Sequence, residues 1–252
     1  MSEAILAALR GIEHERAVRV LFAIESGSRA WGFASPDSDF DVRFVYVHPL
    51  DWYLRITAGD DQITRLLPGD LDVVGWELRK ALRLFGSSNV AMLEHLGSSI
   101  VYRDDGVLLP QLRALVPAFF NAIAAAHHYL GLATRMHQEH LAGSEVNLKK
   151  LFYVLRPLAA CRWIECHQTM PPTGFADVVA GIELSPQQRA WLDELWQQKV
   201  AAGEAQRAPL AADRRAWIDA WLQQSRDRAR SLPHGGGDAA VLDRLLARYA
   251  RA

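Results

Sequence analysis

The sequence predicts an α+β protein, with a short mixed sheet and flanking helices in its first half and helices alone in its second. Between residues 17 and 74, runs rich in β-branched and aromatic residues are separated by Gly, Pro and Asp, as strands are by their turns. Beyond residue 117 the apolar residues recur with helical periodicity. We therefore predict two domains, a head over 1–115 and an all-α domain over 116–252.

The elements of the first half follow from local pattern. Good helix formers come first, apolar strand-like runs follow, and two short helical segments each end at a glycine in the position of a C-cap. The predicted elements are, in order, a helix over 3–13, strands over 17–25, 40–47 and 71–74, and helices over 76–86 and 89–97.

The second half contains amphipathic helical segments separated by Gly- and Pro-rich breaks. Segments that are apolar on one face must pack on one another, so a helical bundle is expected. The predicted helices cover 117–142, 146–168, 186–202, 211–231 and 238–251.

Size and charge limit the classes of protein. The chain has 252 residues, half of them hydrophobic, and a formal net charge of −1, so any attraction to phosphate must come from a local site. The N-terminus lacks the basic-then-apolar pattern of a signal peptide, and no run reaches the roughly 18 apolar residues of a membrane span. We expect a cytoplasmic protein that does not contact a membrane.

Three aspartates alternate with other residues in "SPDSDFDVRFVYV" (35–47). On a strand, Asp39 and Asp41 point the same way, with Cα atoms about 6–7 Å apart. Carboxylates this close repel each other unless a cation lies between them, and hard oxygen ligands favour Mg²⁺ or Mn²⁺. Asp72, between apolar neighbours on the next strand, is a third acid. Asp70 would face the same way on a regular strand and is the alternative.

Asp37, Asp39 and Asp41 also match the first ligand positions of a calcium-binding EF-hand loop. That loop needs Gly at its sixth position and Glu at its twelfth, where this chain has Val42 and His48. The EF-hand interpretation is therefore excluded, and Asp37 is interpreted as a turn residue.

The segment "IESGSRAWG" (24–32) precedes these acids. A strand that ends at Gly27 and Ser28 offers backbone N–H groups and a hydroxyl to phosphate oxygens, and Gly27 allows the backbone to approach closely. Arg29 adds a cation. A phosphate-binding turn and a metal-binding pair are thus predicted on consecutive strands.

The helix predicted over 146–168 carries a polar stripe. Lys149, Tyr153 and Arg156 share a face by their spacing of four and three residues, with Lys150 as the alternative cation. A cation, a phenol and a guanidinium on one stripe suit a triphosphate and a base. In the structural alternative, Lys150 is solvated and Tyr153 packs inside the bundle.

At these residues the sequence resembles the DNA-polymerase-beta-like nucleotidyltransferase superfamily, in which an apolar strand ending in Gly-Ser is followed by Asp-x-Asp and a third acid. The string "GSRAWGFASPDSDFDVRFVYV" resembles its RNA-repair-associated, RlaP-like branch. The resemblance implies a polymerase-beta-like head, metal binding by Asp39, Asp41 and Asp72, and triphosphate binding by Gly27 and Ser28. Asp72 would activate the acceptor hydroxyl.

The implied reaction is transfer of a nucleoside monophosphate from a nucleoside triphosphate (NTP) to an acceptor hydroxyl, with release of pyrophosphate. The branch points to an RNA end as acceptor, which predicts a basic groove leading to the acids. A small molecule or a protein side chain is the alternative acceptor. Outside enzymes, the alternative is a nucleotide-binding regulatory module without turnover.

Overall fold

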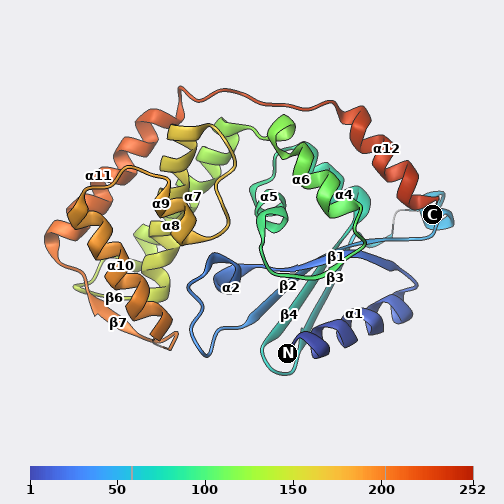
Figure 1. The fold of residues 1–252 in the computed structure, drawn as a ribbon, viewed down its shortest axis with the longest axis horizontal. Coiled ribbons are helices and arrows are strands. Elements are labelled where there is room, and N and C mark those ends of the chain that lie inside the picture. Colours follow the sequence, from blue (N-terminus) through green and yellow to red (C-terminus); the bar gives the residue numbers. More distant parts are fainter. Residues whose placement is uncertain (58, 202, 252) are drawn as a thin grey trace. The chain divides into compact units, whose positions relative to one another are not determined.

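The predicted α+β class is confirmed by a computed structural model that describes residues 1–57, 59–201 and 203–251 (Figure 1). Five strands form one mixed sheet in the order β3-β4-β2-β1-β5. β2 and β4 are parallel, and the other neighbours are antiparallel. The strands are β1 Arg19–Glu25, β2 Phe40–Val47, β3 Gln62–Leu67, β4 Leu71–Glu77 and β5 Val101–Asp104.

The chain forms two compact units that are not continuous in sequence. Unit 1 comprises Met1–Ala30, Asp39–Phe119 and Gly236–Ala252, and unit 2 comprises Trp31–Ser38 and Phe120–Gly235. The sheet thus lies in unit 1, together with a C-terminal segment that the sequence assigns to the helical domain. The stretch between the Gly-Ser turn and Asp39 belongs instead to unit 2.

In unit 1, helices cover both faces of the sheet (Figure 1). One face is covered by α1 (Ser2–Arg16), whose Ile5, Leu9 and Ile12 are buried with Val42 and Phe44 in one apolar cluster. The remaining helices of this unit pack on the other face or at its edge. They are α4 Leu78–Gly86, α5 Val90–Gly97, α6 Leu108–Phe119 and α12 Ala239–Ala250. Two short helices, α2 Gly27–Trp31 and α3 Leu50–Tyr53, follow the ends of strands.

Unit 2 is built on α7 and α8, which pack together and are both contacted by α11. Most of α8 is buried, including the polar Arg156, so this helix lies at the centre of the unit. Phe33 anchors the stretch 31–38 in this unit, because its ring lies 4.9 Å from the ring of Phe152. The elements are α7 Ala122–His140, β6 Glu145–Asn147, α8 Leu148–His167, α9 Phe175–Ala180, α10 Pro186–Ala201, β7 Arg207–Pro209 and α11 Ala212–Ala229.

Several predicted boundaries differ from the structure. The helix predicted over 117–142 is α7 alone, because α6 ends at Phe119 and a break precedes Ala122. Gly86 and Gly97 are the last helical residues rather than the C-caps, which are serines. The predicted helix over 186–202 is α10, and residue 202 lies outside the described residues. β3 and β5 were not predicted.

No single helix in the described residues is long and apolar enough to cross a membrane. Within residues 1–57, 59–201 and 203–251, only α6 and α7 taken together across the break between them reach that length and composition.

Gly75 provides a test of the β2–β4 packing. It lies opposite Phe44, and a Cβ at Gly75 would collide with the buried Phe44 ring. We expect Gly75→Ala to lower the free energy of unfolding by about 1–3 kcal/mol, as overpacking a core does, measured by urea denaturation. The cost should shrink in a Phe44→Leu background. An equal cost in both backgrounds would contradict this packing.

Candidate active site

Two of the predicted acids lie side by side. The parallel register of β2 and β4 places Asp41 opposite Asp72. Both carboxylates accept a hydrogen bond from the same atom, Nη2 of Arg43, at 3.0 Å and 2.9 Å. Arg43 follows Asp41 by two residues on the strand and therefore lies on the same face. The structure thus brings the two acids together around one guanidinium.

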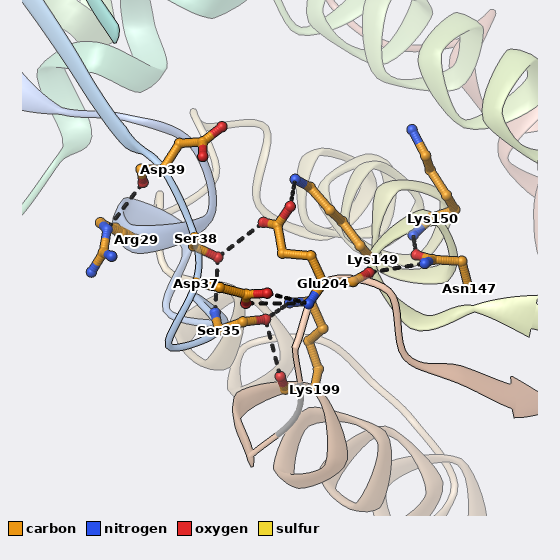
Figure 2. Close-up of polar contacts among 10 residues, drawn as sticks. All are labelled: Arg29, Ser35, Asp37, Ser38, Asp39, Asn147, Lys149, Lys150, Lys199 and Glu204. Atoms are coloured by element: carbon orange, nitrogen blue, oxygen red, sulfur yellow. Dashed lines mark hydrogen bonds and ion pairs between the residues drawn. The ribbon is translucent and has the colours of Figure 1, made fainter. Parts of the chain in front are cut away.

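Asp39 and Asp70 lie outside the strands. Asp39 directly precedes β2 and is exposed, and its carbonyl accepts a 3.0 Å hydrogen bond from Arg29 Nε (Figure 2). The Arg29 guanidinium also lies 3.7 Å from the centre of the Phe40 ring. Asp70 has a left-handed conformation in the β3–β4 turn, with φ of 53°. Of the two candidates for the third acid, only Asp72 lies opposite Asp41.

The Gly-Ser turn packs against Asp41. Gly27 has φ of 61°, a left-handed conformation that favours glycine, and a Cβ there would collide with the Asp41 carboxylate. Ser28 is buried in the first turn of α2. The predicted phosphate-binding turn and the first carboxylate of the pair are therefore direct neighbours.

The environment of Asp41 favours a cation. Burial raises the pKa of its carboxyl, the charge of Arg43 opposes that rise, and the charges of Asp72 and Asp39 add to it. In the described part of the chain, no group of three or more His, Cys, Asp or Glu side chains is arranged as a metal site. The converging oxygens of Asp41 and Asp72 nevertheless form a hard donor pair that suits Mg²⁺ or Mn²⁺.

Glu25 is a residue of this site that the sequence analysis missed. It is fully buried at the end of β1, where its carboxylate accepts the Asp41 N–H at 2.9 Å and the Tyr102 hydroxyl at 2.5 Å. Burial raises the pKa of Glu25. Since β1 ends here, the Glu25 side chain supplies the acceptor that a strand neighbour would otherwise give Asp41. The available signal was an ionisable residue closing an apolar strand next to Gly-Ser.

The predicted stripe on α8 lies in unit 2, where three of its residues share connected ring contacts and Lys149 has a different partner. The Arg156 guanidinium is buried 4.2 Å from the centre of the Trp31 ring, and the Tyr153 ring meets the same indole edge-on at 5.8 Å. Lys150 Nζ lies 5.6 Å from the centre of the Tyr153 ring. Lys149 instead forms a 2.5 Å ion pair with Glu204.

Glu204 also holds the turn that precedes Asp39, as Figure 2 shows. Its carboxylate accepts the Ser38 hydroxyl at 3.1 Å, and its N–H donates to the Asp37 carboxylate at 3.2 Å. The buried Lys199 donates to the Ser35 hydroxyl in the same turn, and burial lowers the pKa of Lys199. Asp37 is indeed a turn residue, but its partner comes from far along the chain.

A short mixed sheet, a Gly-Ser turn and paired acids on neighbouring strands are the features of a polymerase-beta-like nucleotidyltransferase. The family model described as "RlaP: RNA repair pathway DNA polymerase beta family" matches residues 1–248, and the chain belongs to this family. The resemblance predicted from the sequence is confirmed. The chain is also similar to "Uncharacterized protein YcgL" of Bacillus subtilis (strain 168), with 44% identity over 199 residues, which cover 79% of this chain and 76% of the relative.

His95, beside this site on α5, should make stability depend on pH. Its ring lies 4.9 Å from the Trp76 ring, and burial, aided by the Arg43 charge, lowers its pKa from 6.5 to about 3. Its contribution to stability is therefore complete above pH 6.5 and is lost as the pH falls towards 3. Between pH 6.5 and 4, the unfolding free energy of the wild type should fall more steeply than that of His95→Gln, by at most about 1.4 kcal/mol per pH unit. Equal slopes in urea denaturation would contradict a half-buried imidazole that stays neutral in the folded protein.

Proposed function

We propose that the protein transfers a nucleoside monophosphate from an NTP to the hydroxyl of an RNA end and releases pyrophosphate, using Mg²⁺ or Mn²⁺. The observation that carries this proposal is the pair of converging carboxylates, Asp41 and Asp72, beside the turn at Gly27. Membership of a polymerase-beta-like family supports the class of reaction.

In this proposal Asp39, Asp41 and Asp72 hold the divalent cation. When bound, the cation neutralises charge that develops on the phosphate oxygens. The N–H of Gly27 and the hydroxyl of Ser28 bind the triphosphate, and Arg29 adds positive charge. These residues fix the α-phosphorus relative to the acids, which is the main contribution a protein makes to phosphoryl transfer.

The acceptor step uses Asp72 as the base. The hydroxyl oxygen forms a bond to the α-phosphorus while its proton passes to the Asp72 carboxylate. The bond from the α-phosphorus to the oxygen that bridges to the β-phosphate breaks, and its electron pair leaves with pyrophosphate. The family description, which names an RNA repair pathway, is what favours RNA over a small molecule or a protein as acceptor.

The first test is label transfer from NTPs labelled at the α-phosphate to pooled RNA with Mg²⁺ or Mn²⁺. Asp41→Asn and Asp72→Asn should each reduce the rate more than about 100-fold, because they remove charge that is needed in the transition state. Asp70→Asn is the matched control, since asparagine tolerates the left-handed conformation of that turn. It should retain activity.

Circular dichroism and thermal melting would verify that each of these variants is folded. Full activity in folded Asp41→Asn protein would refute the proposed site. Label found on the protein or on a small molecule would show that this molecule, rather than RNA, is the acceptor. No transfer to any acceptor, with nucleotide binding retained, would favour a regulatory module.

We also propose that Lys149, Lys150, Tyr153 and Arg156 contribute to nucleotide binding, because their cations and aromatic ring suit a triphosphate and a base. Lys149→Gln should raise the KM for NTP about tenfold, the value of one charge-assisted hydrogen bond, with little change in kcat. Arg162→Gln, which removes an ion-paired cation from the same helix, is the control. An unchanged KM in Lys149→Gln would remove this residue from the proposal.

A further inference from the structure

The guanidinium of Arg43 contacts both acids of the candidate site. Nη2 bridges the Asp41 and Asp72 carboxylates, and Nη1 donates to the carbonyls of Val42 at 3.1 Å and Asp72 at 3.3 Å. The side chain is only 20% exposed. It is the donor in the hydrogen bonds that both carboxylates accept.

The position of Nη2 is where a cation shared by the two acids would lie. Asp41 directs Oδ1 to Arg43, and its Oδ2 packs against the Gly27 backbone. Asp72 likewise directs Oδ2 to Arg43. A divalent ion that takes Asp41 Oδ1 and Asp72 Oδ2 would therefore compete with the guanidinium for them.

The bridge also has an electrostatic reason. Asp41 and Asp72 are 28% and 32% exposed at their side chains, so water screens their mutual repulsion only in part. Without a cation between them, two carboxylates in register on adjacent strands would separate or bind a proton. Arg43 supplies one positive charge against two negative ones, and the remaining charge still attracts a metal ion.

We propose that Arg43 is a built-in counter-cation: it holds Asp41 and Asp72 together in the metal-free protein and is displaced from them when the divalent ion binds. This inference rests on the proposed metal-binding role of the acids. Breaking the bridge costs part of the binding free energy, so Arg43 weakens the affinity for free metal ions. The acids stay aligned until metal arrives.

The test is Mn²⁺ binding to the full chain without nucleotide, by electron paramagnetic resonance and calorimetry. Arg43→Gln should bind Mn²⁺ about tenfold more tightly than the wild type, the value of one charge-assisted hydrogen bond. Without metal, Arg43→Gln should melt at a lower temperature than the wild type. Adding Mn²⁺ should raise the melting temperature of Arg43→Gln by more than that of the wild type. Arg43→Lys, which keeps the charge without the planar bridge, should lie between the two and serves if Arg43→Gln does not fold.

Arg65→Gln is the matched control. Arg65 lies on β3 in the same sheet, is 31% exposed and pairs with Glu15 rather than with the acids of the site. Its loss should change Mn²⁺ affinity less than twofold. An equal gain in both variants would indicate a general charge effect and overturn the proposal, as would unchanged or weaker binding in both Arg43 variants.

Failure of the underlying metal site would look different. In that case Asp41→Asn and Asp72→Asn would leave Mn²⁺ affinity unchanged, both in the otherwise wild-type protein and when combined with Arg43→Gln. If the acids are the site but Arg43 is no competitor, both asparagine variants lose binding while the Arg43 variants match the wild type.

Discussion

The parallel pairing of β2 with β4 is the constraint on which the candidate site depends. It places Asp41 opposite Asp72, and it seats the Phe44 ring over Gly75, where no larger residue fits. Side chains alternate between the faces of a strand, so a shift of one residue in this register would move Asp72 to the opposite face of the sheet. The buried packing that fixes the register therefore also aligns the two carboxylates.

Residues at the end of β1 position the first of these carboxylates, Asp41. β1 ends at Glu25, whose buried side chain holds the Asp41 backbone, and the chain then turns at Gly27 in a conformation that lets it touch Asp41. Arg43 forms ion pairs with both carboxylates and so offsets part of their negative charge. The turn that leads into Asp39 is held separately, by Glu204. Each acid is thus positioned by residues from other parts of the chain.

The sequence predicted what local pattern and recognisable motifs can carry. The bounds of β2 came from an apolar run, and the observed strand agrees with them. The Gly-Ser turn as phosphate binder and Asp72 as third acid came from motif and flanking residues and stay predictions, although Asp72 does lie opposite Asp41. β3 and β5 were missed because they are short edge strands with exposed positions. Glu25, Arg43 and Glu204 were missed because their partners are set by tertiary packing, which periodicity does not report. The sequence predicted the helix α12 but assigned it to the helical domain, because its own periodicity does not report that it packs against α4.

The proposed reaction requires the oxygens of Asp41 and Asp72 to hold a divalent cation beside the Gly27 turn. A crystal structure with Mn²⁺ and a non-hydrolysable NTP, with anomalous scattering recorded at the manganese edge, tests it most directly. If the two acids hold the ion, an anomalous peak will lie within bonding distance of both carboxylates, and the Arg43 guanidinium will have moved away from them. An ion bound elsewhere, with Arg43 still bridging the two acids, would contradict it.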